Sequence, residues 1–440
     1  MQIGAWLERA AAKHPGRVAV ETPEGAWTYA ELLAAARVGA AALSERGAAP
    51  GERVAIALPA GLEFAQALHA CMLLGAAAVP VDLRLAAAER GRIAAAGAVL
   101  VQEPLPLDGA LLPAGARHDL DAIALVVHTS GTTAAPRPVE LSYGNMLWSA
   151  LGSGVALGVQ QNDRWLCALP LSHVGGLSIL IRSAIYATTA VVHERFETDR
   201  ALAALRTGDV TLVSLVATTL ARLLDAGLER PPALRCALTG GGPVAPALRE
   251  RALAAGVPVS LTYGLTETCS QATTLPAAAL DDPAHTAGPP LFCTRLRLAA
   301  DGEIMLAGPT VARSARLDGG FLATGDLGRL DERGWLRVIG RKADTIVTGG
   351  ENVAPAEVEA VLEAHPDVVE AAVVGRPHDQ WGEMVSAWVV TAPGARLDWD
   401  DLVAHCRAGL APYKVPKDFR ASPDPLPRTA SGKLLRRELA

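Results

Sequence analysis

Apolar and polar positions alternate along most of the chain in a way that predicts helices and short strands in turn. Residues 29–48 carry Ala and Leu at helical spacing, whereas β-branched runs such as 53–58 and 78–81 are typical of buried strands. Further strands are expected at 123–127, 164–168, 190–193, 212–215, 236–239 and 257–262. Because helices and strands alternate, the pattern favours an α/β fold with largely parallel sheets.

The pattern changes towards the C-terminus. Residues 300–340 hold shorter, turn-rich runs that predict antiparallel strands, and a domain boundary is expected at 340–343. Beyond it, a helix opened by Pro355 is followed by strands and a second helix. We therefore expect a large domain (1–340) of layered, parallel-rich sheets with helices, and a small α+β domain (341–440).

Composition narrows the class of protein. Of 440 residues, 50% are hydrophobic and 20% charged, which is typical of globular proteins. The formal net charge of -6 gives no overall basic field for nucleic acid. Six cysteines without CxxC spacing favour a reducing compartment and argue against a zinc site. The oligomeric state is left open, and a homodimer is compatible with the sequence.

No segment has the pattern of a leader or a membrane span. Glu8 and Arg9 interrupt what would be the apolar part of a signal peptide. The most apolar run, 64–81, contains Gln66 and His69 and predicts a buried helix followed by a strand. The cytoplasm is therefore the expected location.

The stretch HTSGTTAAPRPVELSYGN (128–145) lies between a predicted strand and a helix that starts at Tyr143, so we expect a strand-to-helix loop. Hydroxyl and backbone N–H groups in such a loop donate to several phosphate oxygens at once. A solvated Thr-rich turn is the alternative. No Lys-Ser/Thr pair closes the loop, which excludes a P-loop, and Pro138 lacks an N–H. The phosphate-binding candidates are Thr129, Ser130, Gly131, Thr132, Thr133 and the cationic Arg137.

A second candidate is LTYGLTETCS (261–270), which follows the last strand of this series. Ligands of parallel α/β sheets bind at the carboxyl ends of the strands, where Tyr263 and Gly264 are expected. Thr266 has a hydroxyl for phosphate, and Glu267 has a carboxylate for Mg²⁺, which proteins usually bind together with substrate phosphates. The alternative is a turn capped by this Thr/Glu pair.

Three shorter motifs are weak when taken singly. The glycines of GGGP (Gly240, Gly241 and Gly242) permit a flat ring to approach the backbone, although a plain loop would look the same. Asp326 in TGDLG and Arg341 in GRKAD have the groups to bind a ribose. Lys433, in SGK near the end of the chain, would by itself be interpreted as part of a solvated tail.

In this order the motifs resemble those of the adenylate-forming superfamily of acyl-CoA synthetases, luciferases and peptide-synthetase adenylation domains. The resemblance runs from WTYAEL (27–32) to Lys433. Within the superfamily the chain is most similar to the o-succinylbenzoate:CoA ligases of menaquinone biosynthesis. This closer likeness is carried by residues 169–196, 214–224, 239–248 and 263–275.

The resemblance implies an enzyme that uses ATP and CoA as co-substrates and Mg²⁺ as its cofactor. The acid carboxylate attacks the α-phosphate of ATP, giving acyl-adenylate and pyrophosphate, and the CoA thiol then displaces AMP. The implied roles are as follows: Lys433 bridges carboxylate and α-phosphate, Thr266 binds the α-phosphate, Glu267 holds Mg²⁺, Thr129 to Thr133 and Arg137 bind the leaving phosphates, Gly240 to Gly242 and Tyr263 enclose adenine, and Asp326 and Arg341 bind ribose.

The resemblance also implies a small β-barrel-like subdomain in the large domain and a mobile C-terminal domain. The C-terminal domain would turn about Ala343 between the two half-reactions and then present a loop to CoA. That loop would contain Gly349, Gly350, Glu351 and Asn352.

The acid pocket is expected to include Gly264, His173 as a catalytic-site residue at its gate, and Arg222 as the anchor for a second carboxylate. Arg182 is a less favoured anchor. The alternative for the arginine is an ordinary solvated residue on a helix, and the alternative for His173 is a structural histidine. Another acyl- or aryl-CoA synthetase, a carrier-protein adenylation domain and a non-catalytic nucleotide-binding homologue remain as alternatives. The last is disfavoured because Lys433 and Glu267 are both present.

Overall fold

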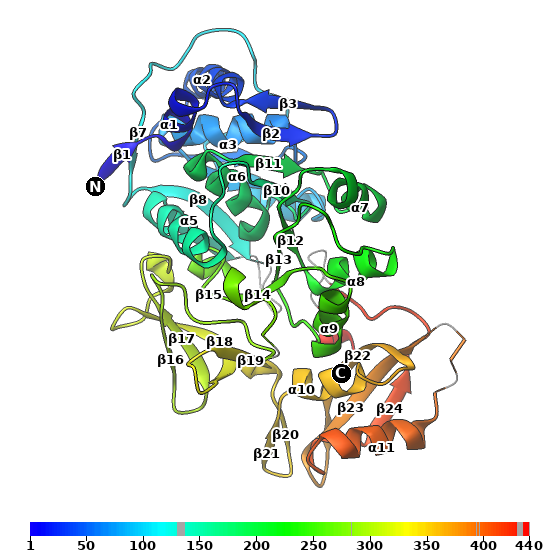
Figure 1. The fold of residues 1–440 in the computed structure, drawn as a ribbon. Coiled ribbons are helices and arrows are strands. Elements are labelled where there is room, and N and C mark those ends of the chain that lie inside the picture. The colour runs from blue at the N-terminus through cyan, green and yellow to red at the C-terminus, as the bar shows by residue number, and fades with distance from the viewer. Residues whose placement is uncertain (130–136, 283, 393, 396, 429–433, 440) are drawn as a thin grey trace.

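Two parallel-rich sheets build the N-terminal part of the computed structural model, which describes residues 1–129, 137–282, 284–392, 394–395, 397–428 and 434–439 (Figure 1). The larger sheet has eight strands in the order β15-β14-β13-β12-β10-β11-β2-β3, parallel from β14 to β2 with antiparallel outer strands. Its strands are β2 (Val18–Thr22), β3 (Gly25–Thr28), β10 (Arg164–Cys167), β11 (Thr189–Val192), β12 (Leu212–Leu215), β13 (Cys236–Thr239), β14 (Val259–Tyr263) and β15 (Thr273–Thr274).

The second sheet has five strands in the order β6-β4-β5-β8-β9. They are β4 (Arg53–Ile56), β5 (Ala77–Pro80), β6 (Val99–Val101), β8 (Ile123–Thr129) and β9 (Arg137–Ser142), and a separate pair joins β1 (Gln2–Gly4) to β7 (Arg117–Asp119). Every residue of β5 and β12 is buried, as expected for strands covered on both faces. The predicted α/β class is confirmed.

The helices of the N-terminal part connect these strands, and their starts follow local sequence signals. Thr28 and Glu31 form a capping box at the start of α2, and Pro246 opens α9. The helices are α1 (Trp6–Lys13), α2 (Tyr29–Glu45), α3 (Leu62–Leu74), α4 (Ala87–Ala94), α5 (Tyr143–Leu157), α6 (Val174–Tyr186), α7 (Thr198–Thr207), α8 (Ala217–Asp225) and α9 (Pro246–Ala254).

The connection predicted at 128–145 as a strand-to-helix loop is in part a β-hairpin, so that prediction was wrong for residues 137–142. β9 returns antiparallel to β8 and pairs Arg137 with Thr129 and Pro138 with His128. Because β9 is the outer strand of its sheet, Pro138 is tolerated there without an N–H. Helix α5 then begins at Tyr143, as predicted.

The turn-rich region forms a four-stranded antiparallel sheet, which confirms the strands expected between residues 300 and 340. The order is β16 (Arg295–Leu298), β17 (Glu303–Ala307), β18 (Phe321–Leu330) and β19 (Leu336–Arg341). Figure 1 shows this sheet in yellow, with the C-terminal elements following β19 in orange and red.

The C-terminal elements have their own sheet and core. The strands are β20 (Ile346–Thr348), β21 (Glu351–Val353), β22 (Val368–His378), β23 (Gly382–Thr391) and β24 (Asp418–Ala421), and the helices are α10 (Pro355–Leu362) and α11 (Trp399–Gly409). Val358, Val373 and Leu402 pack into a buried cluster that contains no residue from before Ile346. In the part of the chain that the structure describes, no helix is long and apolar enough to cross a membrane.

Candidate functional site

Several predicted ligand-binding segments follow neighbouring strands of the larger sheet. β14, β13, β12 and β10 are consecutive and parallel, so their carboxyl ends lie at one edge. The segment with Tyr263 ends β14, the three glycines follow β13, α8 with Arg222 follows β12, and His173 precedes α6 after β10. The topology therefore brings these segments to the edge where α/β sheets bind ligands.

At two glycines of the motifs, neighbouring atoms lie so close that there is no room for a side chain. A Cβ at Gly240 would lie 2.7 Å from Cγ2 and 2.8 Å from the carbonyl oxygen of Thr262, and one at Gly264 would lie 1.6 Å from the carbonyl oxygen of Ser270. Gly242, in contrast, has open space where its Cβ would be. The loop after β13 thus lies directly against β14, with only its last glycine unconstrained by neighbours.

Tyr263, Asp326 and Arg341 meet, although they come from β14, β18 and β19. The Tyr263 hydroxyl donates to Oδ2 of Asp326 at 2.7 Å, and Arg341 Nε lies 2.8 Å from Oδ1. Asp326 is only 6% exposed. Burial raises the pKa of the Tyr263 phenol, and the Asp326 carboxylate raises it further, so the hydroxyl remains a donor. The residues predicted to bind adenine and ribose are therefore neighbours.

Thr266 and Glu267 form the short 3₁₀ turn η1 (Thr266–Thr268). The turn is held in place because the Glu267 carbonyl accepts a 2.7 Å hydrogen bond from the N–H of Ala312. β9 contacts η1, so the strand that begins at Arg137 lies beside this turn. The described residues contain no group of three or more acidic, His or Cys side chains placed to hold a metal ion, so Mg²⁺ at Glu267 would take most of its ligands from phosphate and water.

The structure describes only some of the residues predicted to form the phosphate loop, and it does not describe the predicted catalytic lysine. Thr129 and Arg137 end β8 and begin β9, and the Thr129 hydroxyl donates to the carbonyl oxygen of Arg137 at 3.3 Å. Ser130, Gly131, Thr132, Thr133 and Lys433 lie outside the described residues.

His173 is next to two residues that the sequence did not single out. Nη2 of Arg84 lies 3.3 Å from His173 Nε2, and Oδ2 of Asp82 lies 3.8 Å from the same nitrogen. Both partners come from the loop after β5, in the other sheet. Their signal was a charged pair, Asp-x-Arg, directly after a buried strand, in the position where α/β loops hold functional side chains.

The two arginines considered for the acid pocket have opposite environments. Arg222 is exposed on α8, whereas Arg182 is 2% exposed within α6. Arg182 donates to the Ser149 hydroxyl at 3.0 Å and lies over the ring of Trp165. Ser149 in turn donates to the Cys269 carbonyl at 2.6 Å, so Arg182 supports the chain that follows η1.

The residues predicted to contact CoA form the turn between β20 and β21. Gly349 and Gly350 are its two central residues, with φ of 58° and 85°, between the paired Thr348 and Glu351. Positive φ at both positions is typical of a type I′ hairpin turn, which favours glycine. Gly349, Gly350, Glu351 and Asn352 are all exposed and accessible to a ligand.

The charged residues on the two sides of Ala343 form ion pairs with different parts of the chain. Lys342 Nζ lies 2.6 Å from Asp301 and 3.0 Å from Glu303, which adjoin or belong to β17. Asp344 is instead 3.4 Å from Arg436, near the C-terminus. Residues on the two sides of Ala343 are thus tied to different parts of the chain, the β17 region and the C-terminal segment.

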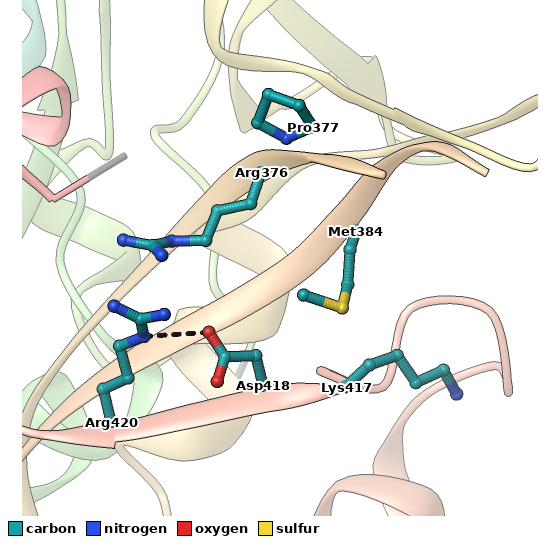
Figure 2. A pocket seen from close by; sticks show the side chains of 6 residues that line it. All are labelled: Arg376, Pro377, Met384, Lys417, Asp418 and Arg420. Atoms are coloured by element: carbon teal, nitrogen blue, oxygen red, sulfur yellow. Dashed lines mark hydrogen bonds and ion pairs between the residues drawn. The ribbon is translucent and has the colours of Figure 1, made fainter. Parts of the chain in front are cut away.

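A hollow of about 600 Å³ lies on the C-terminal sheet, away from Tyr263 and Asp326. Figure 2 shows Arg376 and Met384 on adjacent strands, with Asp418 paired to Arg420 beside them. Lys417 adds a third cation to the lining. This face carries more positive than negative side chains.

Comparison with known proteins places these features in a family. The model of AMP-binding enzymes matches residues 7–102 and 100–314, and that of the AMP-binding enzyme C-terminal domain matches residues 357–433. A 2-succinylbenzoate–CoA ligase of Geobacillus kaustophilus (strain HTA426) is 40% identical, over 99% of this chain and 96% of the relative.

Two solved structures of o-succinylbenzoate coenzyme A synthetase from Bacillus subtilis are also similar, each 36% identical. The complex with the acyl-adenylate intermediate has a TM-score of 0.91 and covers 100% of this chain and 98% of the other. The complex with ATP and magnesium ion has a TM-score of 0.90 and covers 100% of both chains.

Proposed function

The chain belongs to the AMP-binding enzymes, and on that premise we propose that it ligates o-succinylbenzoate to CoA, through an acyl-adenylate, in menaquinone biosynthesis. ATP and CoA are its co-substrates and Mg²⁺ its metal ion. The observation that carries the proposal is the meeting of Tyr263, Asp326 and Arg341 near the segment with Glu267. The location expected for this biosynthetic step is the cytoplasm.

The nucleotide is proposed to bind along the carboxyl edge of the larger sheet. Asp326 would accept hydrogen bonds from the ribose hydroxyls, with Arg341 beside it, and Tyr263 would contact adenine. The Gly240–Gly242 loop offers a backbone surface for the other side of the ring, because Gly242 faces open space. The phosphates would then extend towards η1 and the β8–β9 hairpin.

Adenylation brings two anions together, so the enzyme must mainly position them and neutralise charge. Lys433 is proposed to bridge the acid carboxylate and the α-phosphate, and Thr266 to bind the α-phosphate. Glu267 would hold Mg²⁺, which supplies charge neutralisation to the phosphates. Thr129 and Arg137, with residues 130–133 between them, would bind the departing pyrophosphate.

The thioester step is proposed to follow a turn of the domain 341–440 about Ala343. The ion pairs of Lys342 with the β17 region and of Asp344 with Arg436 support a division of the chain at this residue. A change of backbone torsion needs no particular side chain, so Ala343 is suitable. The turn at Gly349–Gly350, with Glu351 and Asn352, would then contact CoA.

The acid is proposed to lie between His173 and Gly264, with Arg222 near its second carboxylate. The exposure of Arg222 fits a role at the mouth of a pocket, where its charge remains solvated until substrate binds.

The deciding experiment is ATP-dependent thioester formation from o-succinylbenzoate and CoA by the wild type and Lys433→Ala. The wild type should release AMP and pyrophosphate, whereas the variant should lose adenylation by about 10²–10³-fold. Adenylation by Lys433→Ala at the wild-type rate would contradict the mechanism. A panel of other acids, and a carrier protein in place of CoA, would identify a different substrate or thiol.

A further inference from the structure

Asp82, Arg84 and His173 form a cluster where the two parallel-rich sheets approach each other. Asp82 and Arg84 follow β5, and His173 is the residue before the first turn of α6. Nη2 of Arg84 contacts Asp82 Oδ2 at 2.6 Å and His173 Nε2 at 3.3 Å. Arg84 therefore lies between the carboxylate and the imidazole.

Asp82 fixes the position of Arg84. Its Oδ1 accepts from both the backbone N–H of Arg84 at 3.0 Å and the side-chain Nε at 2.8 Å. Burial alone would raise the pKa of the Asp82 carboxyl, but the hydrogen bonds and the charge of Arg84 lower it to about 2. The carboxylate stays ionised at neutral pH, so the pairing persists where the enzyme works.

The contact between Arg84 and His173 specifies how the imidazole is protonated. A guanidinium has only N–H donors, so His173 Nε2 must accept and must carry a lone pair. The proton of the neutral ring is then on Nδ1. Loss of Arg84 would remove this constraint on the tautomer and on the orientation of the ring.

The Asp82–Arg84 pair by itself is a local contact. Arg84 is exposed, and the pair with Asp82 joins residues two apart in one loop. The Asp82 side chain is only 12% exposed, but a pair so close in sequence constrains its own loop and not the packing of the two sheets. The contact between Arg84 and His173 joins the loop after β5 to the start of α6. We therefore look for the role of the cluster at the His173 side chain.

We propose that Asp82 and Arg84 are positioning residues that hold His173 as the Nδ1-protonated imidazole beside the acid substrate. This inference rests on the proposed function, which places His173 at the acid pocket. Arg84 acts on the imidazole directly, and Asp82 acts through Arg84. Neither residue is required to touch the substrate.

The first test is a measurement that needs no substrate. In ¹⁵N-histidine-labelled protein, with the His173 signals assigned from the spectrum of His173→Ala, Nε2 should have the shift of an unprotonated ring nitrogen and Nδ1 that of a protonated one. Arg84→Met should change this distribution, and Arg84→Lys should restore part of it. An unchanged His173 tautomer in Arg84→Met would overturn the proposal, whatever reaction the enzyme catalyses.

The second test is kinetic. Arg84→Met should lower kcat/KM for o-succinylbenzoate by about tenfold, the loss expected for one hydrogen bond to a charged group, with KM for ATP unchanged. Asp82→Asn should act in the same direction. Added to His173→Ala, Arg84→Met should have almost no further effect, since its target is gone. Full additivity of the two changes would contradict a role through His173.

Arg90→Met is the matched control. Arg90 donates to the carbonyl oxygen of Leu83, in the same loop, at 2.9 Å and so supports the loop without contacting His173. Equal kinetic losses in Arg90→Met and Arg84→Met would mean that general loop support, and not His173, explains the effect. That result would also overturn the proposal.

Discussion

The hydroxyl of Tyr263 donates a hydrogen bond to Oδ2 of Asp326, which is 63 residues further along the chain, at 2.7 Å. Arg341 approaches the other oxygen of the same carboxylate at 2.8 Å. A carboxylate oxygen can accept more than one hydrogen bond, so Asp326 can still receive ribose hydroxyls. Tyr263 thus links the end of β14 to the carboxylate proposed to bind the sugar.

Tyr263→Phe should therefore weaken nucleotide binding and leave the acid site intact. Phenylalanine retains the aromatic ring but removes the hydrogen bond that positions Asp326, so we expect roughly a tenfold rise in KM for ATP, which corresponds to about 1.4 kcal/mol of binding free energy. Pyrophosphate release at varied ATP and at varied acid separates the two sites. Equal rises in both KM values would indicate a general disturbance of the fold.

Alanine substitutions within the three-glycine loop should separate packing from ligand binding. Gly240→Ala places a methyl 2.7 Å from Thr262 and should destabilise the protein by about 1–3 kcal/mol, as overpacking usually does. Gly242→Ala meets no atom within 4 Å, so its unfolding midpoint should remain that of the wild type.

If adenine packs on this loop, Gly242→Ala should still raise KM for ATP. Thermal unfolding and ATP kinetics on both variants provide the test. An unchanged KM for ATP in a fully stable Gly242→Ala would remove this loop from the nucleotide site.

Local patterns predicted the sheet core well. Leu212–Leu215 and Cys236–Thr239 are short apolar runs between polar loops, and both are strands with the predicted bounds. β9 was missed because Arg137 and Pro138 begin it and its outer position exposes polar groups, so its composition is that of a loop. Strand pairing with β8, rather than local preference, produces this element.

The candidate site was also predictable only where a local sequence motif marks its residues. Motif order indicated Tyr263, Asp326 and Arg341 together, and the structure brings them into contact. Asp82 and Arg84 have only a weak local signal, the charged Asp-x-Arg pair after β5. Their contact with His173 joins loops of two different sheets, a tertiary relationship that no local sequence pattern contains.

Arg222→Ala should raise KM for o-succinylbenzoate about tenfold and change KM for ATP little, because a charged pair with the second carboxylate would be lost. Since Arg222 is exposed, the unfolding free energy should change by less than about 0.5 kcal/mol. Steady-state kinetics with each substrate varied in turn is the measurement. An acid with one carboxylate should bind both proteins equally. Equal effects on both KM values would exclude the assigned role.

Glu363 should make stability depend on pH near neutrality. Burial raises the pKa of its carboxyl from 4.5 to about 7, and the neighbouring carboxylates of Glu359 and Glu370 add to the rise. A raised pKa means that the folded state binds the proton more tightly than the unfolded state. The stabilisation is complete below pH 4.5 and is lost as the pH rises through about 7.

Glu363→Gln removes this dependence, because an amide does not ionise and its oxygen can still accept the 3.4 Å hydrogen bond from Ala371. Above the raised pKa the variant should be more stable than the wild type by about 3 kcal/mol, and the difference should shrink as the pH falls. Glu357→Gln is the control, since Glu357 is paired with Lys414 and lies more than a third exposed at its side chain. Thermal unfolding across this pH range tests the prediction. A Glu363→Gln variant that follows the wild-type pH profile would show that the carboxyl is ionised in the folded protein throughout.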